Sequence, residues 1–246
     1  MMTLETTVVE ASKGIVQVAW RTGLSNFGVV EVSLDKLPDD TEVAAELLAI
    51  RYLMFKRQVF DRVPSSSKGY LLRVGKGAIK KLAQGRSSKE HLKPYAEFLR
   101  QRLEGVQIEV SRAGEWVNLA LESEVETIDF SGDLVDPHER LMTPAMGEIH
   151  ITKHAVRRYA ERHGDDITNP WGSLTTRLMH PGLRQVEIPR KALLNKAMRH
   201  GRADNVEAWG HPDSRFTYII VNDKKRRTLV TVFRKPKPQR AYMGGE

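Results

Sequence analysis

The beginning of the chain, up to residue 34, is the part of the sequence that most constrains the fold. Segments 6–10, 14–20 and 27–34 are rich in valine, isoleucine and threonine, and short turns separate them. Short runs of β-branched residues between such turns are typical of strands joined as hairpins. The chain is therefore predicted to open with an antiparallel meander of three strands, which requires a fold built around a sheet.

Helices alternate with single strands after this meander. Asp40 or Thr41 is a predicted N-cap, and apolar residues then recur at helical spacing. A second group of helices and strands begins near residue 147, so the predicted class is α+β with two domains. In the first group we predict a long helix at 42–60, a strand at 70–74, helices at 77–82 and 89–103, and a strand at 106–112.

This order of elements resembles the ribonuclease H-like fold over about residues 3–125, and Ala45-Glu46-Leu47 in the long helix sharpens the resemblance. The resemblance implies a metal-binding role for Glu46 and a catalytic aspartate at the end of the first strand, where this chain has Glu10 or its neighbours. It also implies an aspartate after the fourth strand, but Arg73-Val74-Gly75-Lys76 contains none. Glu122 and Glu124 follow the last strand without clearly supplying a further ligand.

The incomplete set of carboxylates argues against metal-dependent catalysis by residues 1–125. Two-metal phosphodiester chemistry needs several carboxylates that converge on the ions. Arg73 and Lys76 would repel metal ions from the place where another carboxylate is needed. We therefore predict a non-catalytic domain in which Glu46 is a surface or partly satisfied helix residue.

Residues 126–147 are predicted to form an acidic linker. Residues 105–146 contain two basic and nine acidic side chains, and glycine and proline interrupt any long element there. A solvated connection is the main interpretation. The alternative is that this segment lies over the basic second domain as an intramolecular mimic of nucleic acid.

A short helix is predicted from Thr152 to Gly164, and it holds the densest group of side chains in the sequence that could bind phosphate or transfer protons. Thr152 is a predicted N-cap and Gly164 a predicted C-terminal stop. An apolar stripe includes Ala155, Val156 and Tyr159. His154, Arg158 and Glu161 cluster beside this stripe, with Arg162 at its edge and Arg157 facing away. An amphipathic helix with a solvated basic face is the alternative interpretation.

The rest of the second domain is predicted to be helical and then antiparallel. Asn169-Pro170 begins a helix, and the last two strands form a hairpin around Asp223-Lys224. The predicted domain spans 148–236, followed by a basic tail at 237–246. Its further elements are a helix at 192–200 and strands at 205–209, 215–222 and 227–234.

The pattern His154-Ala-x-x-Arg158-Tyr-x-Glu161-Arg162, followed by a hairpin that ends in Thr231-Val-Phe, resembles small RelE/BrnT-like toxin-type proteins. The resemblance implies metal-independent RNA cleavage. Such cleavage needs a proton-transferring group and cations that stabilise the phosphorane. Trp209 is a candidate for base stacking, and His211 is a second candidate imidazole. The candidate catalytic residues are His154, Arg158, Glu161 and Arg162, and the candidate nucleic-acid-binding residues are Arg157, Arg215, Tyr218, Arg226, Arg227 and Arg234.

The charge is divided unevenly along the chain. Residues 147–246 carry 20 lysines and arginines against 10 aspartates and glutamates, whereas residues 1–146 carry 19 against 21. A basic half indicates a polyanionic partner, for which RNA is preferred over DNA here. Three classes of function stay open: a metal-independent endoribonuclease, a non-catalytic module that binds nucleic acid, and a protein that uses its first domain or acidic linker against a protein partner.

Composition limits the remaining options. The chain contains no cysteine, which excludes disulfides, thiolate nucleophiles and cysteine-ligated metals. His150 and His154 are four residues apart but lack a third ligand nearby, so no metal and no cofactor is predicted. No apolar run is long enough to span a membrane and no signal peptide is evident, so we expect a cytoplasmic protein without a membrane partner. Phages or mobile elements are plausible sources of such two-domain proteins.

Overall fold

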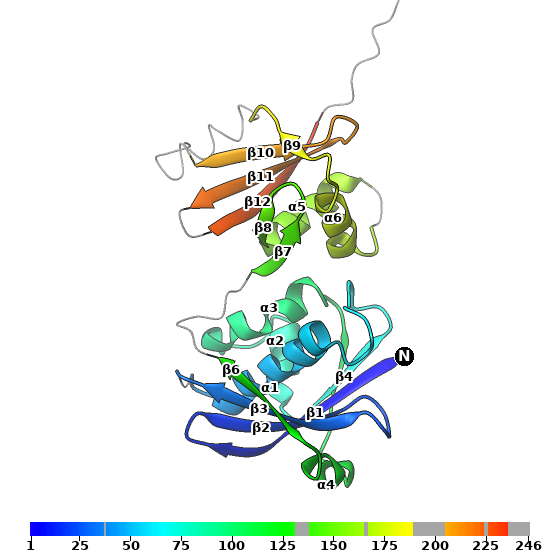
Figure 1. Ribbon diagram of the computed structural model, residues 1–246, viewed down its shortest axis with the longest axis vertical. Helices are drawn as coiled ribbons and strands as arrows, with labels where there is room; N and C mark the ends of the chain where they lie inside the picture. Colours follow the sequence, from blue (N-terminus) through cyan, green and yellow to red (C-terminus); the bar gives the residue numbers. More distant parts are fainter. Residues whose placement is uncertain (37, 131–137, 165–166, 189–204, 224–225, 236–246) are drawn as a thin grey trace, which may run out of the picture. The chain divides into compact units, whose positions relative to one another are not determined.

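The computed structural model describes residues 1–36, 38–130, 138–164, 167–188, 205–223 and 226–235. The chain divides into two compact units, Met1–Pro137 and His138–Glu246. Each unit has its own six-stranded sheet with helices packed against it (Figure 1). The predicted α+β class with two domains is confirmed.

The sheet of the first unit begins with the predicted meander. Strands β1, β2 and β3 are antiparallel neighbours, and β4 and β5 continue the sheet beyond β1 in parallel orientation. The order along the sheet is β5-β4-β1-β2-β3-β6. The five strands predicted for the first domain are all present, and β6 is an additional one. The strands are β1 (Met2–Ser12), β2 (Ile15–Arg21), β3 (Phe27–Leu34), β4 (Tyr70–Val74), β5 (Gln107–Val110) and β6 (Val125–Phe130).

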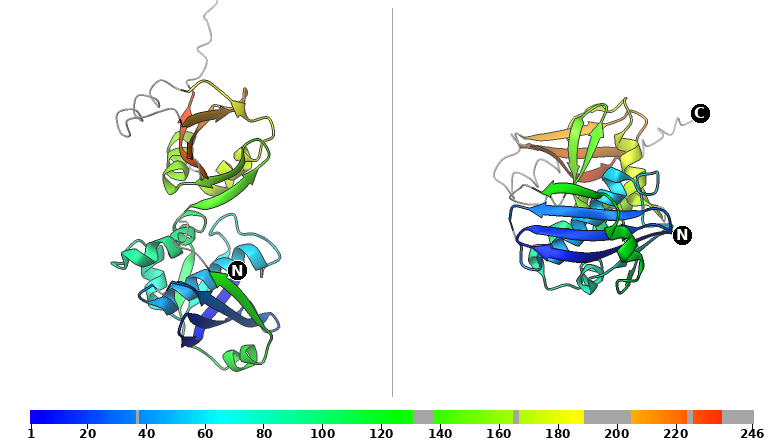
Figure 2. Two further views of the ribbon diagram at one scale, coloured as in Figure 1. Left: turned by 60° about the vertical axis from the view of Figure 1, so that its left-hand side comes forward. Right: turned by 60° about the horizontal axis from the view of Figure 1, so that its bottom comes forward.

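Most helices of the first unit cover one face of this sheet (Figure 2). The central one, α1, is buried at every position from Val43 to Ile50, because the sheet and α3 contact different sides of it. The predicted helix at 42–60 is shorter than expected, since Leu53–Arg57 is a π-helical turn and Gln58 adopts a left-handed conformation with φ 57°. The helices are α1 (Thr41–Tyr52), α2 (Gly77–Ala83) and α3 (Lys93–Gln101), with a short 3-10 helix at Glu90–Leu92.

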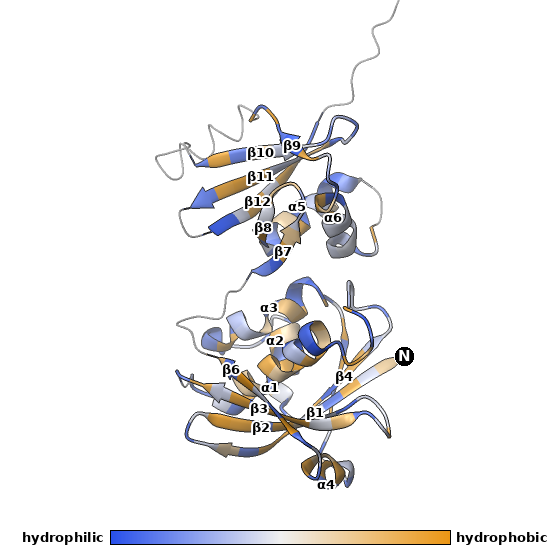
Figure 3. Ribbon diagram, in the orientation of Figure 1, coloured by the Kyte–Doolittle hydropathy of each residue, from blue (hydrophilic) through white to orange (hydrophobic). Residues whose placement is uncertain are grey.

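The acidic segment differs from the expected linker at 126–147. Helix α4 (Trp116–Leu121) packs Val117 and Ala120 against Ala19 and Val29 on the second face of the first sheet. Strand β6 then pairs in parallel with β3 as far as Phe130. Val117 and Ala120 of the largely apolar helix α4 are therefore core residues of the first unit (Figure 3). Among the described carboxylates of the acidic segment, Glu124 and Asp129 are exposed near this sheet edge, whereas Glu139 is buried.

The sheet of the second unit also begins earlier than predicted. Strand β8 precedes the helices and lies parallel to the last strand, β12, so the sheet is mixed and strands come before helices. The order is β7-β8-β12-β11-β10-β9. The strands are β7 (Glu139–Thr143), β8 (Gly147–Ile151), β9 (Arg184–Gln185), β10 (Val206–Gly210), β11 (Phe216–Asp223) and β12 (Arg226–Arg234).

Two helices, α5 (Lys153–His163) and α6 (Pro170–Leu178), form the core of the second unit with one face of this sheet. Asn169 caps α6 by accepting a hydrogen bond from the Gly172 amide, with Pro170 in the first turn as predicted. The predicted helix at 192–200 and tail at 237–246 lie outside the described residues. Among the helices that are described, none has the length and apolar composition needed to cross a membrane.

Candidate functional site

Glu46 lies at the place where the ribonuclease H-like resemblance implies a metal ligand. Its side chain is 0% exposed. Oε1 accepts hydrogen bonds from the Thr6 hydroxyl at 2.9 Å and from the Gly75 amide at 2.8 Å. Oε2 has no hydrogen-bond partner among the described residues. Glu46 is thus partly satisfied, as predicted, but it is a core residue and not a surface residue.

The surroundings of Glu46 do not suit a divalent metal ion. Its nearest polar partners from β1 and from the end of β4 are Thr6 and Gly75, so no second carboxylate faces it there. A Cβ atom on Gly75 would lie only 2.9 Å from the Thr7 hydroxyl, which leaves no room for a carboxylate side chain. Burial raises the pKa of Glu46 to about 7, against the opposing effect of the Gly75 and Thr6 hydrogen bonds. A fully buried carboxyl that is easily protonated is a poor ligand for magnesium.

Two other expectations about this place are wrong. Glu10 is exposed and pairs with Gln17 in the β1–β2 ladder, away from Glu46. Arg73 lies on the face of the sheet opposite to Glu46, where its Nε donates to Glu109 at 3.0 Å. Alternation along β4 explains this, because Leu72 and Val74 fill the core on the α1 side. Lys76 is close to Glu46 through its backbone amide, while its ammonium group pairs with Glu42.

The second candidate site lies on α5, whose ends are those predicted from the sequence. The Thr152 hydroxyl accepts a hydrogen bond from the Ala155 amide at 3.0 Å and donates to the Leu229 carbonyl at 3.0 Å. Gly164 ends the helix with φ 85°, a conformation that favours glycine. Ala155, Val156 and Tyr159 are buried against the sheet. The polar side of α5 is consequently held toward solvent by both its caps and its core contacts.

The polar side of α5 carries an imidazole, three arginines and one carboxylate. Glu161 bridges two arginines, accepting from Arg158 Nη1 at 2.8 Å and lying 3.5 Å from Arg157 Nε. An Arg157 Nη2 nitrogen lies 3.4 Å from His154 Nδ1. His154, Arg157 and Glu161 are exposed, and Arg158 is half-buried. The structure therefore brings together four predicted residues within about two turns of one helix.

The pKa values of both His154 and Glu161 on α5 are lowered, for different reasons. Partial burial lowers the pKa of His154, and the positive charges of Arg158 and Arg157 lower it further, with Glu161 opposing them. The hydrogen bond from Arg158 holds the pKa of Glu161 below its usual range. At neutral pH, His154 is therefore a neutral imidazole next to cations, which can accept a proton or a hydrogen bond.

Two further predicted arginines lie at the C-terminal end of α5. The guanidinium carbon of Arg162 is 4.5 Å from the ring centroid of Phe233, a cation–π contact with β12. Arg234 is exposed, and its Nη1 would lie 3.1 Å from a Cβ atom placed on Gly164. A guanidinium near the end of a helix also interacts favourably with the helix dipole. Arg162 and Arg234 extend the basic side of α5 toward its C-terminus.

The remaining predicted nucleic-acid contacts do not gather around α5. Tyr218 is 1% exposed in the core, so its ring cannot stack on a base in this fold, and burial raises the pKa of its hydroxyl. Arg227 is committed to an internal network in which it donates to Glu207 and to the Met146 carbonyl. Arg226 is exposed beside the β11–β12 turn, whereas Arg215 is exposed at the opposite end of the hairpin, next to Arg234.

Trp209 and His211 also have local structural partners. The Trp209 indole donates to Glu207 at 2.8 Å, and the Arg227 guanidinium carbon lies 5.5 Å from its ring centroid. His211 Nδ1 accepts from the Asp213 amide at 3.2 Å, and its ring centroid is 4.4 Å from that of His180. Neither residue contacts the side chains that cluster on α5 in any interaction among the described residues.

Sequence reasoning missed a polar cluster between α5 and α6. Arg177 Nε donates to the Tyr159 hydroxyl at 2.8 Å, and its guanidinium carbon lies 5.2 Å from the Phe216 ring centroid. His163 stacks on the same Phe216 ring, with centroids 6.0 Å apart. The position of Arg177 in the last turn of a predicted amphipathic helix was the only available signal. Its partners come from two other elements and could not be read from local spacing.

Comparisons with known proteins add little to this description. No protein-family model matches the chain, and no curated protein matches it. Among solved structures, the crystal structure of ribonuclease H1 from the halophilic archaeon Halobacterium salinarum NRC-1 is similar at 16% identity, with a TM-score of 0.33. The match covers 48% of this chain and 90% of that chain. None of these comparisons supports the resemblance of the second unit to RelE/BrnT-like toxins, which stays a sequence-based prediction.

Proposed function

We propose that this protein binds nucleic acid through the polar side of α5. One observation carries the proposal: the polar side of this helix holds three arginines and one imidazole but only one carboxylate, Glu161. Arginine matches phosphate oxygens through its planar fork, and a neutral imidazole can accept hydrogen bonds from hydroxyl or base groups. Arg234 extends this surface at the C-terminal end of α5.

The first unit serves in this proposal as a non-catalytic domain. The sealed Glu46 carboxyl and its neutral neighbours Thr6 and Gly75 support this role. Phosphodiester cleavage by paired divalent ions depends on carboxylates that reach solvent and converge on both ions. A magnesium-dependent nuclease activity of the first unit would contradict the proposal directly.

The binding test compares two double substitutions in the full-length protein. Arg157→Gln with Arg158→Gln removes two charges from α5, and Lys80→Gln with Lys81→Gln removes two exposed charges from α2 as a matched control. Affinity for single-stranded RNA, double-stranded RNA and DNA is measured by fluorescence anisotropy at one salt concentration. We expect the α5 variant to lose affinity on the order of tenfold, because fewer counterions are released when fewer phosphates are neutralised. Equal loss in both variants would refute a specific role of α5.

A metal-independent endoribonuclease is the second candidate function, and the lowered pKa of His154 beside Arg158 favours it. His154 would accept the proton of the 2′-hydroxyl as the 2′-oxygen attacks phosphorus, and Arg158 would stabilise the phosphorane. The P–O5′ bond then breaks, and the leaving 5′-oxygen takes a proton from water. Because the attacking oxygen belongs to the substrate, cleavage should persist in EDTA and leave a 2′,3′-cyclic phosphate.

The cleavage test uses His154→Ala and Arg158→Lys with end-labelled RNA. We expect His154→Ala to lower the cleavage rate by about 10²–10⁴-fold with nearly unchanged affinity, the range for one general acid–base group. Arg158→Lys retains the charge but loses the planar fork, so it should also lose rate more than affinity. If the wild type binds RNA and does not cut it in EDTA, the ribonuclease candidate is wrong and the binding proposal stands.

A further inference from the structure

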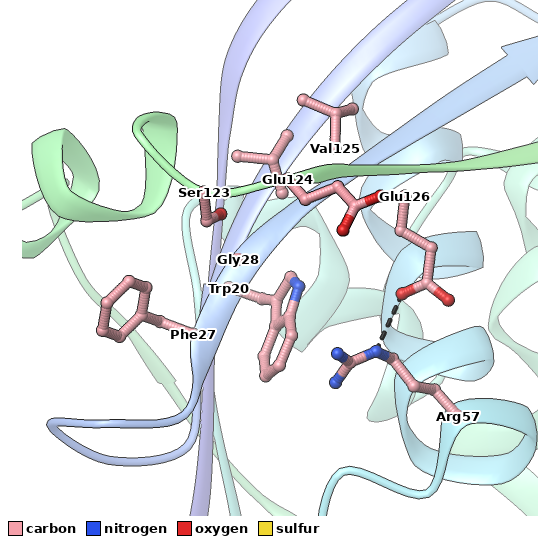
Figure 4. A pocket seen from close by; sticks show the side chains of 9 residues that line it. Trp20, Phe27, Gly28, Arg57, Ser123, Glu124, Val125 and Glu126 are labelled. Atoms are coloured by element: carbon pink, nitrogen blue, oxygen red, sulfur yellow. Dashed lines mark hydrogen bonds and ion pairs between the residues drawn. The ribbon is translucent and has the colours of Figure 1, made fainter.

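The first unit contains a pocket where the α4–β6 connection meets the ends of β2 and β3. Its volume is about 420 Å³. Trp20 and Phe27 line it with rings that lie on different faces of the sheet, and Arg57, Glu124 and Glu126 supply charge (Figure 4). None of these residues belongs to the α5 surface or to the surroundings of Glu46. The pocket is therefore a separate candidate for binding.

One guanidinium already occupies part of this pocket. The guanidinium carbon of Arg57 lies 4.5 Å from the Trp20 ring centroid, and its Nε donates to Glu126 Oε2 at 2.8 Å. The Tyr52 hydroxyl donates to the other oxygen of Glu126. A cation held between an indole and a carboxylate gains both cation–π and charge-assisted hydrogen-bond energy. The pocket thus already binds one arginine side chain of the same chain, Arg57, through an aromatic ring and a carboxylate.

The shape of the pocket depends on Gly28. A Cβ atom on Gly28 would lie 3.2 Å from the Trp20 indole nitrogen, so the indole can rest across β3 only because this position has no side chain. Gly28 is directly opposite Trp20 in the β2–β3 ladder. This cross-strand arrangement fixes the position of the indole on which Arg57 stacks.

Glu124 provides a second carboxylate with no cation bound to it. It lines the same pocket as Glu126, is exposed, and has no ion pair or hydrogen bond from its side chain among the described residues. Among the residues that line the pocket, two carboxylates, Glu124 and Glu126, stand against one cation, Arg57. A positively charged group is therefore the complementary occupant of the remaining space.

Strand β6, which begins beside the pocket, is the last strand of its sheet. An edge strand presents backbone N–H and C=O groups that can pair with an extended segment of another chain. Val125, Thr127 and Asp129 are exposed along this strand. An extended basic segment lying along β6 would carry its side chains past the mouth of the pocket.

We propose that this pocket receives an arginine side chain from a basic, extended segment of a partner protein that pairs with β6. The incoming guanidinium binds Glu124, in parallel with the internal pair of Arg57 and Glu126. Arginine fits better than lysine because its planar group can bind a carboxylate bidentately. This partner site is independent of nucleic-acid binding by α5.

The test uses a short acetylated and amidated peptide with one central arginine flanked by valine and threonine. A second peptide carries citrulline in place of arginine and has the same shape without the charge. Binding to the full-length protein is followed through the indole N–H signal of Trp20 in ¹⁵N NMR spectra. We expect the arginine peptide to shift this signal and the citrulline peptide to leave it unchanged.

Two carboxamide variants assign the binding to the pocket. Glu124→Gln should weaken binding of the arginine peptide about tenfold, since a hydrogen bond to a charged group is removed. Glu122→Gln removes an equally exposed charge two residues earlier, outside the pocket lining, and should leave the affinity unchanged. Equal weakening in both variants, equal binding of the citrulline peptide, or equal binding of free acetylarginine amide would each overturn the proposal.

Discussion

At the scale of single residues, the clearest feature is the burial of Glu46. Thr6 and Gly75 satisfy one of its oxygens, and the other has no hydrogen-bond partner among the described residues. A buried carboxyl with neutral partners favours its protonated form, because burial penalises the charge. Glu46, for which the sequence resemblance implied a metal-binding role, is a core residue in this structure.

Burial of Glu46 makes the stability of the first unit depend on pH. Its folded pKa of about 7 is higher than its ordinary value of 4.5, so the folded state keeps a proton that the unfolded state releases between these values. The contribution of Glu46 to stability is complete below pH 4.5 and falls until pH 7, by roughly 3 kcal/mol in total. Glu46→Gln should remove this loss. Chemical denaturation at several pH values measures it, with Glu10→Gln as an exposed control; parallel curves for wild type and Glu46→Gln would contradict the assignment.

At the scale of elements, hydrogen bonds join the start of α5 to the sheet of the second unit. Strand β8 pairs with β12 at Thr228 and Leu229, and the chain then enters α5. The Thr152 amide and hydroxyl both donate to the Leu229 carbonyl, which joins the start of the helix to the strand. The basic side of α5 is therefore positioned by hydrogen bonds to β12 as well as by apolar packing.

This junction should be sensitive to the Thr152 hydroxyl. Thr152→Ala removes the helix cap and the hydrogen bond to Leu229, and we expect it to lower the free energy of unfolding of the second unit by about 1–2 kcal/mol. Thr152→Ser retains the hydroxyl and should cost only a small part of this. Hydrogen exchange of the α5 amides measures the local effect. Similar exchange rates in the alanine and serine variants would show that the hydroxyl contributes nothing.

At the scale of the whole molecule, the two halves of the chain differ in charge. Residues 147–246 carry 20 basic and 10 acidic side chains, whereas residues 1–146 carry 19 and 21. The salt dependence of nucleic-acid binding reports this difference, since log affinity should fall linearly with log salt concentration. The Arg157→Gln and Arg158→Gln variant should have a slope reduced by about two, because each arginine that no longer neutralises a phosphate removes about one unit. An unchanged slope would place the phosphate contacts elsewhere.

The pocket at Trp20 belongs to the acidic half and the α5 surface to the basic half. The two proposals therefore involve partners of opposite charge, and each can fail without the other. A protein that binds nucleic acid through one unit and a basic protein segment through the other would act as an adaptor between them. Binding measurements with both ligands present would show whether the sites are coupled.

Much of the local structure was determined by the sequence alone. The meander at 6–34, the strand at 70–74 and both caps of α5 follow from alternation, turn residues and capping preferences, which act within a few residues of chain. The grouping of His154, Arg158 and Glu161 also follows, because side chains three or four residues apart lie on the same side of a helix. Arg157, which was expected to face away, joins this group through Glu161 and His154. The net charge of each half needs no structure at all.

Only the tertiary structure decided which of the candidate side chains can reach a ligand. Tyr218 lies in the core, Arg227 binds Glu207, Glu46 is sealed by Thr6 and Gly75, and residues 125–130 form a strand of the first sheet. Each of these outcomes depends on a partner many residues away in the chain, which periodicity and spacing do not encode. Burial and pairing between distant segments are set by how strands and helices pack against one another.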